Sequence, residues 1–133
     1  MKKTLIISTF IFSLLPMLGN AETGDELFEY TKSANKVMSG DNSSTKIDYL
    51  NAGQLLGFVT GVVDSLNAVD FCISPEVKKR VLVDKVSKYL DENRGKNNIP
   101  GSMSVSFALG KEYPCNENRK QCIHLGGKYC ESW

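Results

Sequence analysis

The sequence predicts an all-α protein, a compact bundle of about four helices with disulfides and a short C-terminal hairpin or loop extension. Apolar residues recur at i, i+3 or i+4 and i+7 spacing over most of the chain, as on one face of a helix. Runs of turn-forming residues separate these stretches. Four cysteines in 133 residues offer covalent cross-links to a core of modest size.

The first 21 residues have the features of a secretory signal peptide. A charged start at Lys2 and Lys3 precedes an apolar run that is too short to span a bilayer, and the small residues Gly19 and Ala21 precede the expected cut. No cysteine lies beside that cut, which argues against a lipid anchor. We therefore expect residues 22–133 to form one exported, periplasmic domain without membrane anchoring.

The charge of the chain argues against nucleic acid as a partner. Removing Lys2 and Lys3 from the 16 basic residues leaves the basic residues one short of the 15 acidic ones. A surface that binds nucleic acid needs a basic excess to neutralise phosphates. We therefore expect no nucleic-acid partner.

Four segments are expected to be helical, namely residues 25–39, 47–69, 74–93 and 102–111. The first carries acidic residues in its first turn, where they suit the positive end of the helix dipole, and turn formers follow it at residues 39–44. The third begins at Ser74-Pro75-Glu76, a typical N-cap and first turn. The apolar residues of the last three segments that we expect to face the core are Tyr49, Ala52, Leu56, Val59, Val63, Leu66, Val77, Val81, Leu82, Val86, Tyr89, Leu90, Met103 and Phe107, with Val105 and Leu109 as further candidates.

Small residues recur at every fourth position of the second segment, at Gly53, Gly57, Gly61 and Ser65. Each glycine costs roughly 1 kcal/mol relative to alanine inside a helix. Three glycines in register therefore indicate a backbone that another helix approaches closely. Packing within the molecule is the favoured use of this stripe, and a dimer interface that includes Tyr49 and Leu50 is the alternative.

The cysteines Cys72, Cys115, Cys122 and Cys130 all follow the expected cut, and an even number in a short exported chain indicates disulfides. The sequence leaves three pairings open, and we favour Cys72 with Cys115 and Cys122 with Cys130. Loop entropy gives roughly 4 kcal/mol for the first pair and roughly 2.5 kcal/mol for the second. A zinc site that includes His124 is disfavoured because the spacing fits no common finger.

The sequence offers no catalytic constellation. The single histidine, His124, lies between two apolar residues in the cysteine-rich tail, and we interpret it as structural or exposed. The chain contains no G-x-S-x-G, no H-E-x-x-H and no glycine-rich phosphate loop. We therefore expect a binding protein and not an enzyme, with no catalytic residue, no metal and no cofactor.

Five short segments of the chain form an ordered set of motifs: GFVTGVVDS (57–65), CISP (72–75), VSKYL (86–90), FAL (107–109) and YPC (113–115). In this order they resemble the Rap/Tai family of type VI secretion immunity proteins. The family patterns are G-[YF]-x-x-G-x-x-D-[AS], C-I-P, V-x-x-Y-L and A-L followed by [FY]-P-C, and CISP departs from its pattern by an inserted serine. Members often carry a cysteine before the first glycine, where this chain has Leu55 and Leu56, and the resemblance does not reach residues 116–133.

The resemblance implies a small all-helical periplasmic protein, often a homodimer, that binds a peptidoglycan amidase effector from neighbouring cells and blocks its active site. For contact with the effector we favour the connection between the third and fourth segments, because it offers a cation, amides and an apolar tip. The alternative is an ordinary solvated turn. The residues of this connection are Arg94, Gly95, Lys96, Asn97, Asn98 and Ile99.

Two rival functions share part of this pattern. A periplasmic helical chaperone of the acid-resistance type has a similar size, a signal peptide and a disulfide. It would protect client proteins at low pH without a dedicated partner. A small secreted enzyme or toxin is disfavoured by the missing catalytic constellation, and it would harm a cell that expresses it in the periplasm.

Overall fold

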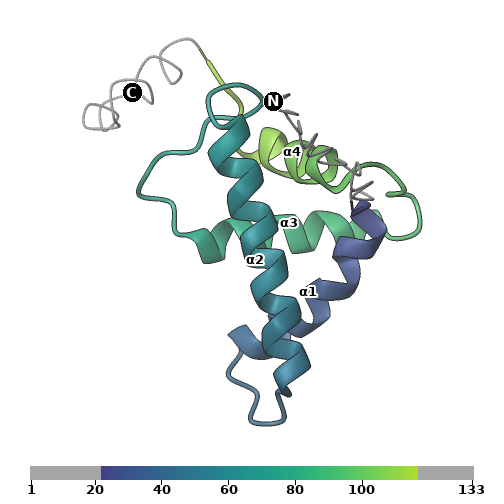
Figure 1. Ribbon diagram of the computed structural model, residues 1–133. Coiled ribbons are helices and arrows are strands. Elements are labelled where there is room, and N and C mark those ends of the chain that lie inside the picture. Colours follow the sequence, from purple (N-terminus) through teal and green to yellow (C-terminus); the bar gives the residue numbers. More distant parts are fainter. Residues whose placement is uncertain (1–21, 117–133) are drawn as a thin grey trace, which may run out of the picture.

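The computed structural model describes residues 22–116, and this part of the chain folds into four helices (Figure 1). They are α1 (Gly24–Met38), α2 (Lys46–Leu66), α3 (Lys79–Glu92) and α4 (Gly101–Glu112). Between residues 22 and 116 there are isolated bridges but no strand. The predicted all-α bundle of four helices is confirmed. The signal peptide, the C-terminal hairpin, His124 and the Cys122–Cys130 pair lie outside the described residues.

The core lies where α1, α3 and α4 pack against the long helix α2. In Figure 1, α3 crosses behind α2, and α4 lies near its C-terminal end. Every helix contributes at least one side chain that is completely buried, and so does the α2–α3 connection through Phe71. The completely buried apolar residues are Leu27, Leu55, Val59, Phe71, Val86, Leu90, Val105 and Leu109.

Helices α1 and α2 pack against each other, and both begin with a capping box. Thr23 and Thr45 are N-caps, and each forms a capping box with an acidic residue three positions on, Glu26 and Asp48. Asp48 also accepts hydrogen bonds across the helix pair, from the Ser33 hydroxyl at 3.0 Å and the Lys36 ammonium at 3.2 Å. One carboxylate thus starts α2 and fastens it to α1.

Stability is expected to fall as the pH drops below about 3.8, the ordinary pKa of an aspartate such as Asp48. In the folded protein the pKa of Asp48 lies well below that value, chiefly because the backbone N–H and hydroxyl of Thr45 donate to its carboxylate. A lowered folded-state pKa gives stability that is complete above the unfolded pKa and is lost as the pH falls through the folded pKa. Melting curves of wild type and Asp48→Asn should therefore differ near neutral pH and converge in acid. A constant difference over the whole range would contradict this role.

The inward face of α2 matches the prediction at Val59 and at the partly buried Ala52, Val63 and Leu66, but not elsewhere. Tyr49 and Leu56 are 60% and 41% exposed, whereas Leu55, Val59 and Val62 face the core. Because α2 is apolar on more than one face, its periodicity does not identify the buried one. The helix also stops at Leu66, short of the predicted end at residue 69. None of the helices in residues 22–116 is long and apolar enough to span a membrane.

The start of α3 was placed too early by the prediction. Residues 75–77 form a turn, and the helix begins at Lys79. The Ser74 hydroxyl donates to the Glu76 carboxylate instead of accepting from a backbone N–H, so the expected cap is not used. The preceding segment is held by Asn67, whose side chain accepts from the N–H of Ile73 at 2.8 Å and donates to the Ile73 carbonyl at 3.1 Å.

On α3 and α4 the prediction is confirmed for Leu82, Val86, Leu90, Val105 and Leu109, which are all buried, but it is wrong at three positions. Val81 is 40% exposed, while Val83 is buried in its place. Met103 and Phe107 are 45% and 51% exposed, and the core side of α4 consists of Ser104, Val105, Ala108 and Leu109. A polar residue at a core position, Ser104, conceals the true face of α4 in the sequence.

The disulfide between Cys72 and Cys115 is confirmed, with the two α-carbons 4.9 Å apart. It joins the α2–α3 connection to the segment that follows α4. The backbone N–H of Cys72 donates to the Tyr113 carbonyl at 2.8 Å in the same place. A covalent bond and a hydrogen bond therefore hold the α2–α3 connection to the segment after α4, across a sequence separation of 43 residues between the cysteines.

Candidate functional site

The connection between α3 and α4 is fastened to the start of α1. The backbone N–H groups of Gly24 and Asp25 donate to the carbonyls of Ile99 at 3.0 Å and Asn97 at 3.2 Å. The N–H of Gly95 donates in turn to the Asp25 carboxylate at 3.0 Å. The first turn of a helix has N–H groups without helical partners, and here the loop supplies acceptors for two of them. The loop is therefore held in one shape by the helix beneath it.

Of the six predicted contact residues, Asn97 lies inside the molecule. It is 2% exposed, and its side-chain oxygen accepts from the Ser104 hydroxyl at 3.0 Å. Gly24 lies directly against both groups, since a β-carbon there would collide with the Ser104 hydroxyl and the Asn97 amide. The expectation that the Asn97 amide meets a partner is therefore corrected, because burial makes this residue an internal support of the loop. An asparagine in a polar turn gives no sequence signal for that position.

The rest of the loop lies at the surface. Arg94, Gly95, Lys96 and Asn98 are exposed, and Ile99 is half-buried beside them. Gly95 has φ +72°, a left-handed conformation that favours glycine, and it turns the chain between the two cations. Within residues 22–116, Lys96 has no ion-pair partner. The loop thus offers two neighbouring cations and an amide on a fixed backbone.

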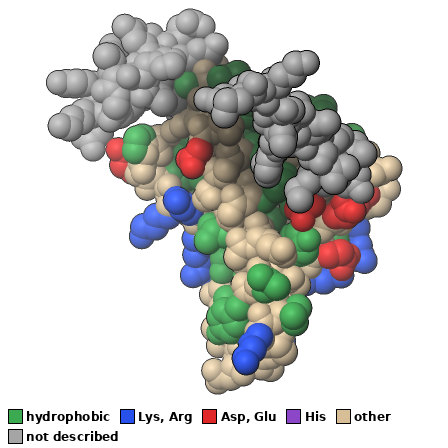
Figure 2. Space-filling model, viewed as in Figure 1, with side chains coloured by type: hydrophobic (Ala, Val, Ile, Leu, Met, Phe, Trp, Pro, Cys, Tyr) green, Lys and Arg blue, Asp and Glu red, His purple; other side chains and the backbone are tan. Residues whose placement is uncertain are grey.

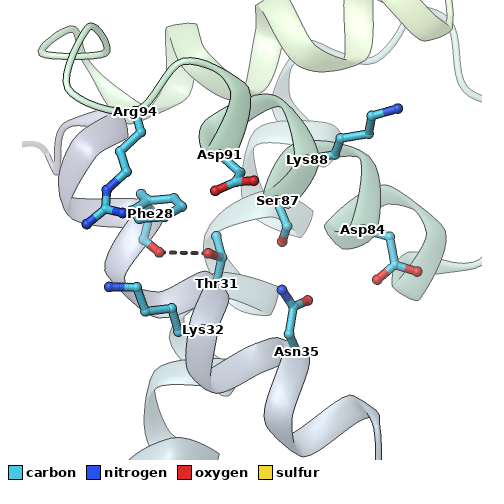
Figure 3. Close-up of a pocket in the computed structure, with 9 residues that line it drawn as sticks. All are labelled: Phe28, Thr31, Lys32, Asn35, Asp84, Ser87, Lys88, Asp91 and Arg94. Carbon is cyan, nitrogen blue, oxygen red and sulfur yellow. Dashed lines mark hydrogen bonds between the residues drawn. The ribbon is translucent and has the colours of Figure 1, made fainter.

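Arg94 also belongs to a groove between α1 and α3 (Figure 3). Its guanidinium lies over the Phe28 ring, 4.9 Å from the centroid, within the range of a cation–π contact. Lys32 approaches the same ring to 5.3 Å. The groove has a volume of about 540 Å³ and continues along α3 past Ser87 to Asp84. This groove was not predicted, because it forms only where α1 and α3 lie side by side.

The exposed face of α2 is the third surface feature. A β-carbon added at Gly53, Gly57 or Gly61 would meet nothing within 4 Å, so the glycine stripe faces away from the described part of the molecule. The favoured use of the stripe, packing within the molecule, is therefore wrong for residues 22–116. Tyr49 and Leu50 are 60% and 57% exposed near the start of the helix. Figure 2 shows hydrophobic side chains gathered over this part of α2.

The two described cysteines are joined to each other, and no group of three or more metal-binding side chains occurs in residues 22–116. A disulfide-linked helical body with a fixed, cationic loop is typical of a small binding protein.

The comparisons with known proteins identify the family. The model of the Rap1a immunity proteins matches residues 23–115, most of the chain, and the chain belongs to this family. The match begins at the cap of α1 and ends at Cys115, so it includes all four helices. Membership indicates an immunity protein that binds a cognate effector. No curated protein matches the chain.

Proposed function

We propose that this protein is a periplasmic immunity protein that binds a peptidoglycan amidase delivered by type VI secretion and blocks its active site, which protects the producing cell. The observation that carries the proposal is the family match over residues 23–115. The predicted signal peptide at residues 1–21 supports action in the periplasm, where the amidase meets its substrate. The Cys72–Cys115 disulfide fits an oxidising compartment of that kind.

The inhibitory element in this proposal is the α3–α4 loop. An inhibitor must fill the substrate cleft of its enzyme and exclude water and substrate from it. Ordering a loop at an interface costs affinity, and a loop that is already fixed avoids most of that cost. The hydrogen bonds from Gly24 and Asp25 to this loop supply the fixation, and Arg94, Lys96 and Asn98 supply the contacts.

Titration of residues 22–133 against the amidase effector encoded beside the gene tests the function. We expect a Kd in roughly the nanomolar range, about −12 kcal/mol, together with loss of peptidoglycan cleavage. An amidase that stays active and unbound would overturn the proposal. The periplasmic chaperone would then be the better hypothesis, and protection of client proteins at low pH would be the next measurement.

We also propose that the protein forms a homodimer through the exposed face of α2. Three glycines on one helix face allow a second helix backbone to approach closely, and the exposed Tyr49 and Leu50 add apolar area beside them. A second copy presents the same helix face, which a two-fold interface requires. A dimer interface would explain why α2 contains three glycines that lower its helix propensity and contact nothing else in residues 22–116.

Gly57→Leu is expected to stabilise the fold by about 1 kcal/mol and to dissociate the proposed dimer. Leucine has the higher helix propensity, and the new side chain has open space in one protomer. In a dimer, the same side chain would hold the two helices apart. Denaturant unfolding and light scattering after size exclusion measure the two effects. The control Gly24→Ala should destabilise the fold, because its β-carbon collides with Asn97. If the Gly57→Leu variant still forms a dimer, this interface is excluded.

A further inference from the structure

The groove between α1 and α3 contains a buried hydroxyl without a partner. Ser87 is 6% exposed, and its Oγ makes no hydrogen bond to any of residues 22–116. The nearest hydroxyl across the groove, on Thr31, donates to the Phe28 carbonyl at 2.7 Å. Figure 3 shows the Ser87 side chain directed toward α1, between Thr31 and Asn35. Buried polar atoms nearly always have partners, so an orphan that faces a groove points to a ligand atom there.

Two carboxylates lie on either side of this hydroxyl along α3. Asp84 and Asp91 precede and follow Ser87 by one helical turn, line the same groove and are exposed. Neither forms an ion pair within residues 22–116. The unused groups along this wall are therefore hydrogen-bond acceptors, two of them charged.

The cations around the groove are already engaged. Lys32 pairs with Glu29 at 3.1 Å and approaches Phe28, and Lys88 lies 3.8 Å from Glu92. Arg94 is held over Phe28 at the loop end of the groove. An anion would have to displace these contacts and lie beside two free carboxylates, whereas a cation would find unused acceptors.

We propose that the α1–α3 groove binds a basic side chain, best a guanidinium, presented by the effector next to the segment that meets the α3–α4 loop. This inference rests on the proposed function and names the chemistry of one subsite. A guanidinium has five N–H donors in a planar fork, which suits the Ser87 hydroxyl oxygen and one neighbouring carboxylate, while the second carboxylate adds attraction from farther along the wall. The volume of about 540 Å³ is in the range that holds a ligand of several heavy atoms with its flanking groups.

The groove lies next to the α3–α4 loop. Arg94 is the first residue of the predicted contact segment and also lines the groove. An effector surface that meets Lys96 and Asn98 therefore lies beside the groove entrance. Repulsion from Arg94 directs an incoming cation away from the loop end and toward Asp84 and Asp91.

The test is an NMR titration of residues 22–133 with N-acetyl-arginine amide, with the uncharged citrulline analogue as the matched probe. We expect saturable shifts at residues 31, 35 and 84–91 for the arginine probe only. Asp84→Asn/Asp91→Asn should weaken this binding by about tenfold or more, since it removes both charged acceptors. Ser87→Ala should keep the fold and weaken binding less. The exposed Asp64→Asn on α2 should change nothing.

The inference is overturned if the arginine probe gives no saturable shifts, if citrulline binds equally well, or if acetate or phosphate binds the groove instead. Its failure differs from failure of the proposed function. An effector that binds the Asp84→Asn/Asp91→Asn variant with wild-type affinity would refute the subsite and keep the immunity function. A chain that binds the arginine probe at the groove but no amidase would keep the subsite and refute the named partner.

Discussion

Replacing both Cys72 and Cys115 with alanine is expected to lower the free energy of unfolding by about 4 kcal/mol. The bond closes a loop with a sequence separation of 43 residues, and cross-linking a loop of that length removes this much chain entropy from the unfolded state. Domains of this size have total stabilities of about 5–15 kcal/mol. The loss should lower the melting temperature by at least about 15 °C.

Calorimetric melting of the oxidised wild type, the reduced wild type and the double variant measures this effect. Reduction should lower the stability at least as much as the substitution, because it also breaks the predicted Cys122–Cys130 bond. The matched control is Cys122→Ala/Cys130→Ala, for which the shorter predicted loop gives about 2.5 kcal/mol. Equal losses for the two double variants would contradict the predicted difference between the pairs.

Local signals were sufficient to predict which segments are helical. Residues 25–39 and 102–111 were expected to be helical, and α1 and α4 lie within about a residue of those ranges. Turn formers and apolar spacing act over a few residues, so a single chain displays them. The Cys72–Cys115 pair differs, because the sequence left three pairings open and only the favoured one is the bond that the structure contains.

Tertiary contacts decided what the sequence did not reveal. Ser74-Pro75 had the composition of a helix start, but the hydrogen bonds between Asn67 and Ile73 keep that segment out of the helix. Asn97 was expected at the surface, yet contact with Ser104 and Gly24 holds it inside. Asn67 and Ile73 are six residues apart and Asn97 and Ser104 are seven apart, while Gly24 lies on another helix, and helical periodicity predicts none of these contacts.

The two parts of the candidate site, the α3–α4 loop and the α1–α3 groove, differ in how far the sequence predicted them. That residues 94–99 form a connection was predictable, because this polar, glycine-containing segment lies between two segments with helical apolar spacing. The groove was not, because it exists only where α1 and α3 lie side by side and leave the Ser87 hydroxyl without a partner. The exposed side of α2 needed the structure as well, since apolar residues occur on both of its faces.

The variant Arg94→Glu/Lys96→Glu is expected to weaken effector binding roughly a hundredfold and to leave the fold intact. Both side chains are exposed, and the cation–π contact that Arg94 loses with the Phe28 ring is worth only about 0.5–1 kcal/mol. Charged groups that pair across an interface contribute about 2–5 kcal/mol when one partner is removed, and about 3 kcal/mol corresponds to roughly a hundredfold change in Kd. Titration against the amidase, with a melting curve of the free variant, measures both parts of the expectation.

The matched control is Lys46→Glu/Lys79→Glu, which changes the net charge by the same amount at the starts of α2 and α3, away from the loop (Figure 1). If the loop is the contact, its variant should dissociate much faster, whereas the control should alter only the association rate, and less so at high salt. Equal weakening by both variants would mean that the overall field of the protein attracts the effector. Unchanged affinity of the loop variant would remove the loop from the interface. Dissociation rates therefore separate a local contact from long-range attraction, which affinity alone does not.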